Sequence, residues 1–176
     1  MVGLEVRYNC RWSKPLTFYA CLMHFYCGGL FLARIERSIE VFASPEEVFR
    51  YLRELERMPE WMPSCKSHRI TSERRYGVGV TSHCVMEHSG RTIEWDSVIT
   101  EWEENRRLTW HCEEPTKNDG TFLLEPTERG TKVTFIMNYE LPYSVLGMII
   151  DRLKVSKEIE RDIAEALSRL KEKVER

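Results

Sequence analysis

The sequence predicts an α+β domain in which a curved antiparallel sheet of about seven strands packs around one long C-terminal helix. Three observations predict this fold. Turn residues interrupt strand-like segments every ten to fifteen residues or so between Ser64 and Glu140, which is typical of antiparallel strands. One strand and a capped helix precede that region. An amphipathic helix follows it.

The first predicted strand covers 34–41, where apolar and charged residues largely alternate. A helix is expected to start at Ser44, because serine can cap free backbone amides and Pro45 suits a first helical turn. Glu47 completes a capping box with that serine. A second short helix is predicted between Pro59 and Pro63. The fold thus has two short helices after its first strand.

Six further strands are expected between 64 and 140, and those near 108–113 and 132–139 alternate clearly. Their main apolar faces contain Leu108, Trp110, Cys112, Val133, Phe135, Met137 and Tyr139. One face of the sheet is therefore expected to be buried and the other to meet water. Alternation is weaker at 80–88 and 93–102, so the faces of these segments stay unassigned.

The last segment, from Pro142 to Arg176, carries apolar residues at helical spacing. They are Leu146, Ile149, Ile150, Leu153, Ile159, Ile163, Leu167, Leu170 and Val174. Such a helix would be about 45–50 Å long. Because a twisted sheet cannot contact a straight helix evenly, we expect a cavity between them. The more uniformly apolar part, 145–153, should border the cavity, while 159–174 should pack on the sheet.

Residues 1–33 differ from the rest of the chain. Basic residues precede a largely apolar run at 16–33, whose length of about 18 residues is marginal for crossing a bilayer. Three interpretations compete: a membrane anchor, an extra packed element, or upstream sequence included by a wrongly assigned start. We favour the last, which makes 1–33 an N-terminal extension and 34–176 the folded domain. Membrane contact through 16–33 is the alternative.

Composition argues against several functional classes. A net charge of -2 and a pI near 6.2 argue against a nucleic-acid binder, which needs basic residues to neutralise phosphates. The six cysteines form no CxxC pair, and the histidines lack zinc-finger spacing, so no metal site is predicted. Scattered cysteines fit a reducing, cytoplasmic location. Without a phosphate-binding glycine loop or a GxSxG motif, no cofactor is predicted either.

Four stretches carry a family resemblance: 35–49, 55–63, 124–134 and the end of the helix at 167–171. Their order and spacing resemble the START-like, or SRPBCC, superfamily of polyketide cyclases/dehydrases and lipid-transport proteins, over about 35–174. The stretch from Pro59 to Cys65 is also similar to the coenzyme-Q-binding branch. The resemblance implies a helix-grip fold with a hydrophobic pocket between the sheet and the C-terminal helix. It carries over no catalytic residue, because the superfamily has no universal catalytic motif.

The expected pocket lining consists of apolar side chains that could equally be ordinary core. The candidate ligand-binding residues are Trp95, Trp110, Phe122, Leu124, Phe135, Met137, Tyr139, Val145, Met148, Ile149 and Leu153. The first hypothesis is non-catalytic binding or transport of a small hydrophobic ligand, such as a lipid, an isoprenoid or a quinone.

Two alternatives stay open. One is a cyclase or dehydratase that uses Tyr139, Tyr143 or His83 as acid or base, although His83, His88 and His111 are expected at the surface. Such an enzyme should bring at least two titratable groups with perturbed pKa values together in the cavity. The other is a protein-interaction module, which a gap filled by side chains would favour.

Overall fold

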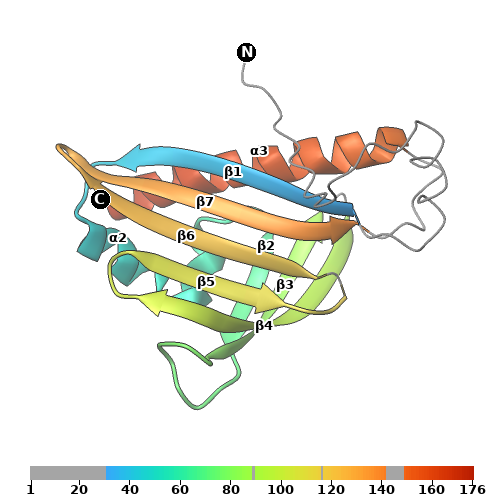
Figure 1. The fold of residues 1–176 in the computed structure, drawn as a ribbon, viewed down its shortest axis with the longest axis horizontal. Helices are drawn as coiled ribbons and strands as arrows, with labels where there is room; N and C mark the ends of the chain where they lie inside the picture. Colours follow the sequence, from blue (N-terminus) through green and yellow to red (C-terminus); the bar gives the residue numbers. More distant parts are fainter. Residues whose placement is uncertain (1–30, 89, 116, 142–148) are drawn as a thin grey trace, which may run out of the picture.

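The structure, a computed structural model, describes residues 31–88, 90–115, 117–141 and 149–176, without the side chains of 31, 32, 88, 91, 141 and 149–156. Within this part, seven strands form one antiparallel sheet in the order β1-β7-β6-β5-β4-β3-β2 (Figure 1). They are β1 (Phe31–Val41), β2 (Cys65–Ile70), β3 (Thr81–His88), β4 (Arg91–Glu103), β5 (Arg107–Cys112), β6 (Asn118–Thr127) and β7 (Gly130–Leu141). The predicted α+β, helix-grip fold is confirmed.

Two short helices follow β1, as predicted. Helix α2 (Pro45–Leu52) has the predicted capping box: the Glu47 amide donates to Ser44 Oγ, and the Ser44 amide donates to Glu47 Oε2 at 2.9 Å. The 3₁₀ helix η2 (Leu55–Glu60) begins before Pro59, earlier than expected. Buried side chains of both elements pack toward the sheet, so the two helices cover part of its inner face (Figure 1).

The inner face of the sheet is apolar across the central strands. Leu108 of β5 lies opposite Phe122 of β6, which in turn lies opposite Phe135 of β7, and all three are buried. The faces left unassigned are now resolved, because Ser82 and Ser97 are buried on the same side as these residues. The pairing of β4 with β5 shifts between Ile99 and Glu101. Such a shift interrupts the alternation of buried and exposed residues from which a strand face is predicted.

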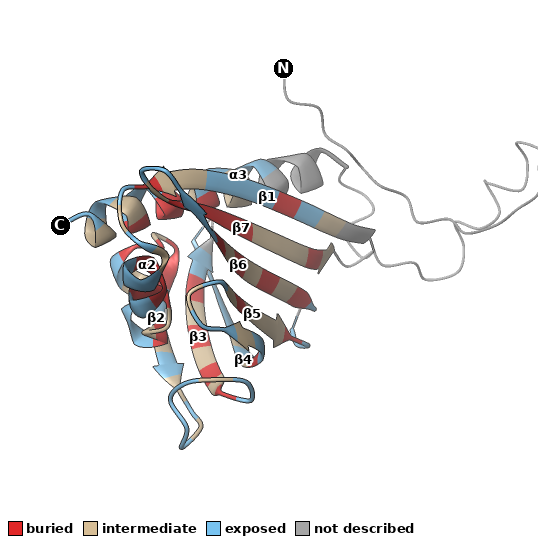
Figure 2. Ribbon diagram, turned by 60° about the vertical axis from the view of Figure 1, so that its left-hand side comes forward, coloured by how far each residue is buried: buried red, intermediate tan, exposed pale blue. Residues whose placement is uncertain are grey.

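Helix α3 (Ile149–Val174) lies along β1 and closes the open side of the curved sheet (Figure 2). Its side chains at Ile163, Ala166, Leu167 and Leu170 are buried. Polar contacts also attach it to β1, since Lys171 Nζ donates to the carbonyl of Glu40 at 2.7 Å. Residues 142–148, where the helix was expected to begin, lie outside the described residues. In the described part of the chain, no helix combines the length and apolar character needed to cross a bilayer.

Candidate functional site

A cavity of about 100 Å³ lies between the inner face of the sheet, η2 and α3. Most of its lining is apolar, and the lining residues come from both short helices, from α3 and from strands β2 to β7. The apolar and thiol-bearing lining residues are Leu52, Leu55, Met58, Trp61, Met62, Cys84, Met86, Trp95, Ile99, Leu108, Trp110, Phe122, Phe135, Met137, Ile159 and Ile163. The polar lining residues are Glu54, Ser64, His68, Ser82, Ser97, Asn118 and Asp162.

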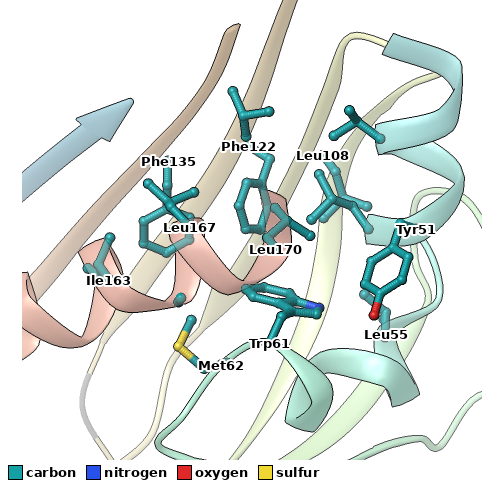
Figure 3. Close-up of a cluster of buried hydrophobic side chains, with 14 of the residues drawn as sticks. Tyr51, Leu55, Trp61, Met62, Leu108, Phe122, Phe135, Ile163, Leu167 and Leu170 are labelled. Atoms are coloured by element: carbon teal, nitrogen blue, oxygen red, sulfur yellow. The ribbon is translucent and has the colours of Figure 1, made fainter. Parts of the chain in front are cut away.

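Aromatic rings from the adjacent strands β5, β6 and β7 form one side of the cavity. The ring centroids of Phe122 and Phe135 are 4.9 Å apart, and Trp110 lies 6.0 and 5.8 Å from them. Trp61, which follows η2, packs edge-on against Phe122 at 5.8 Å. Figure 3 shows Ile163 on α3 and Phe135 on the sheet, and both line the cavity. The arrangement offers flat apolar surfaces suited to a ring or an alkyl chain.

Gly120 of β6 makes room for this aromatic side. It lies directly opposite Trp110, and a Cβ atom added at Gly120 would be 1.9 Å from Cζ2 of the indole. The ring therefore occupies the space that any other residue at this position would need. A side-chain-free position in β6 sets where a major cavity-lining ring lies.

Five of the predicted ligand-binding residues line the cavity: Trp95, Trp110, Phe122, Phe135 and Met137. Leu124 and Tyr139 are buried core residues outside the lining.

The predicted helix residues lie elsewhere. Val145 and Met148 fall outside the described residues, as do the side chains of Ile149 and Leu153. The helix residues that line the cavity are Ile159, Asp162 and Ile163, in a part that we expected only to pack on the sheet. The physical reason is that α3 lies along β1, so its middle faces the concave sheet rather than a flat surface (Figure 2).

Three polar side chains from adjacent strands form a connected group on the cavity wall. His68 Nε2 is 2.8 Å from Ser82 Oγ, and Ser82 Oγ is 3.0 Å from Ser97 Oγ. Burial lowers the pKa of His68 to about 4, so its imidazole is neutral at pH 7. His68 Nδ1 and the nearby lining atom Ser64 Oγ are buried without a hydrogen-bond partner among the described residues.

A buried thiol pair lies beside this group. Cys84, which lines the cavity, has its Sγ 4.0 Å from Cys65 Sγ on β2. The contact with Cys65, together with burial, raises the pKa of the Cys84 thiol, so this group stays protonated. Among the described residues, no group of three or more acidic, histidine or cysteine side chains could hold a metal ion.

The surface histidines face away from the cavity. His83 Nδ1 lies 2.9 Å from Asp96 Oδ1 on the neighbouring strand, and His111 lies 2.6 Å from Asp119 and 2.7 Å from Glu113. Two hydrogen bonds raise the pKa of His111: the one with Asp119 has the larger effect, and the one with Glu113 has the smaller. His83, suggested above as an acid or base, is therefore wrongly placed for cavity chemistry, and Tyr143 lies outside the described residues.

Residues 33–175 match the family described as "Polyketide cyclase / dehydrase and lipid transport". The chain belongs to this family. No curated protein matches it.

Solved structures share the fold of this chain. TTHA0849 from Thermus thermophilus is 25% identical, with a TM-score of 0.68 over 81% of this chain and 96% of that one. The Zhui aromatase/cyclase from Streptomyces sp. R1128 is 15% identical, with a TM-score of 0.70 over 83% and 95%. Ara h 8.0201 is 15% identical, with a TM-score of 0.59 over 82% and 99%.

Family membership did not point to His68, Ser82 or Ser97, and sequence reasoning missed them. A usable signal did exist, because serines at 82 and 97 share strand parity with Cys84 and Trp95. Small polar residues on an otherwise apolar strand face indicate either close packing or a polar contact inside the fold. The missing information was the pairing of the three strands, which places the side chains in contact.

Proposed function

We propose that this protein binds a small hydrophobic ligand in the cavity between the sheet and α3, without catalysing its conversion. The observation that carries the proposal is the cavity itself, which has an aromatic side and predominantly apolar lining residues. Apolar burial contributes about 25 cal/mol per Å² removed from water, before the costs of ordering the ligand. A space of about 100 Å³ is smaller than an engineered cavity of about 150 Å³ that accepts benzene, so it suits at most about one small ring or a short alkyl chain.

A cyclase or dehydratase is the second candidate, and His68 is the observation in its favour. His68 and Cys84 both line the cavity and both have perturbed pKa values. Both shifts favour the uncharged form, however, and an imidazole with a pKa of about 4 is a weak base at neutral pH. This balance supports binding over catalysis. The presence of a cavity also argues against the protein-interaction module, which a gap filled by side chains would have favoured.

The test is extraction of the natively purified full chain with organic solvent, followed by mass spectrometry of the extract. We expect a hydrophobic compound to co-purify with the wild-type protein in a fixed ratio. Ile159→Trp, which places an indole in the cavity, should lower that ratio several-fold. Arg161→Trp adds the same side chain at an exposed position two residues further along α3, and it should retain the compound.

Equal retention by wild-type, Ile159→Trp and Arg161→Trp protein would place the compound elsewhere and refute the cavity as its site. Conversion of the extracted compound on incubation with fresh protein would favour the enzyme instead. In that case His68→Gln should lower the conversion strongly, because His68 is the neutral imidazole on the cavity wall.

A further inference from the structure

The cavity has two chemically different sides. Strands β5–β7 contribute the aromatic group around Phe122, whereas β2–β4 contribute the connected group of His68, Ser82 and Ser97. These two sets of strands occupy different parts of the sheet order (Figure 1). A ligand that fills the cavity would therefore meet aromatic rings from β5–β7 and, on the β2–β4 side, these hydrogen-bonding groups together with apolar side chains such as Trp95 and Ile99.

The polar side carries no positive charge at neutral pH. Neither lysine nor arginine occurs among the described lining residues, and the acidic side chains there are Glu54 and Asp162. Burial keeps the His68 imidazole neutral. A carboxylate or phosphate ligand would thus lose its hydration without gaining a cation, which is strongly unfavourable.

Ser97 can make a further hydrogen bond to a ligand after its bond with Ser82 is formed. If His68 Nε2 carries the proton, it donates to Ser82, Ser82 donates to Ser97, and the Ser97 hydroxyl is left to donate to a ligand. If His68 Nδ1 carries the proton, each bond reverses, Ser97 donates to Ser82, and Ser97 Oγ is left to accept. The tautomer of one neutral histidine therefore decides whether Ser97 is a donor or an acceptor.

We propose that the group of His68, Ser82 and Ser97 binds one uncharged hydroxyl or carbonyl group of an otherwise apolar, ring-containing ligand, with Ser97 as the contacting residue. The inference rests on the proposed function and specifies its ligand class. It excludes fatty-acid carboxylates and phospholipid headgroups as occupants of this side. Reversal of the hydrogen bonds lets the same three residues accept either a hydroxyl or a carbonyl.

Calorimetric titration with three matched probes tests the inference on the full chain at neutral pH. The probes are phenol, toluene and benzoate, which present a neutral hydroxyl, a methyl group and an anion on the same single ring. A wholly apolar cavity would prefer the methyl compound, because burying an unpaired hydroxyl is costly. We expect phenol to bind about tenfold more tightly than toluene, and benzoate to bind most weakly.

Ser97→Ala should remove the preference for phenol while leaving the affinity for toluene unchanged. Thr100→Ala, an exposed position on the same strand, should keep the preference. Equal binding of the first two probes to wild-type protein, or a preference that persists in Ser97→Ala, would overturn the polar anchor while leaving cavity binding intact. If none of the probes binds, both the proposed function and this inference fail.

Discussion

Replacing Gly120 by alanine should disturb the cavity through Trp110. The backbone at Gly120 belongs to β6 and pairs regularly with β5 and β7, so alanine meets no conformational obstacle there. The obstacle is the indole, because the new Cβ would lie 1.9 Å from Trp110 Cζ2. Ordinary contact needs at least about 3.5 Å. The ring must therefore move by more than an ångström, toward neighbours that already pack against it.

Overpacking of this kind typically costs about 1–3 kcal/mol. Without the indole, alanine should instead stabilise the strand by about 0.5–1 kcal/mol relative to glycine. The sign of the effect of Gly120→Ala thus depends on Trp110. A double-mutant cycle with Trp110→Ala should give a coupling energy of about 2 kcal/mol between the two positions.

Urea unfolding of the wild type, both single variants and the double variant measures this coupling. Gly120→Ala should also weaken binding of a cavity probe such as phenol, because the displaced ring lines the cavity. The reasoning is refuted if Gly120→Ala is neutral or stabilising in the presence of Trp110. It is also refuted if the destabilisation persists after the indole has been removed.

Substitutions at three further positions test other parts of the structure. Burial lowers the pKa of His68 from 6.5 to about 4, so as pH falls through this window the unfolded chain binds the proton first and up to about 3 kcal/mol of stability is lost. His68→Gln should flatten that part of the pH profile in urea titrations between pH 7 and 4, and an unchanged slope would contradict the assignment. Gly130→Ala should lower the free energy of unfolding by at least about 2 kcal/mol, because its Cβ would lie 2.2 Å from the last carbonyl oxygen of β1. A thermal midpoint equal to that of the wild type would refute this. Thr131→Val should cost about 1–3 kcal/mol by leaving the Ala43 carbonyl without its 2.7 Å hydrogen bond, whereas Thr131→Ser should cost less; equal losses would point to packing instead.

Much of the cavity's aromatic side could be predicted, because period-two alternation assigns a face wherever a strand is regular. Trp110, Phe122 and Phe135 lie on β5, β6 and β7, which pair with one another without a register shift, so their common face followed from the sequence. Ser97 lies on β4, whose pairing with β5 shifts after Ile99, and its serine gives no apolar signal. It shares strand parity with Trp95, but spacing alone could not show that it contacts Ser82.

The sequence predicted helix α3 but not which part of it lines the cavity. Its stripe indicated a buried face, and Leu167 and Leu170 do pack in the core. Which part of that stripe meets the cavity depends on how the sheet curves, and Ile159 and Ile163 were not expected there. Sheet curvature arises from twist summed over many paired strands, so no local spacing in the helix encodes it.

The sequence alone determined the order of elements, the capped start of α2 and the apolar face of the regular strands, because these depend on residues close together in the chain. Only the tertiary structure decided the polar side of the cavity. His68 and Ser82 are 14 residues apart, and Ser82 and Ser97 are 15 apart. Their hydrogen bonds exist because the pairing of β2 with β3 and of β3 with β4 places the three side chains next to one another. A pairing shifted by one residue would turn the serines to the opposite face.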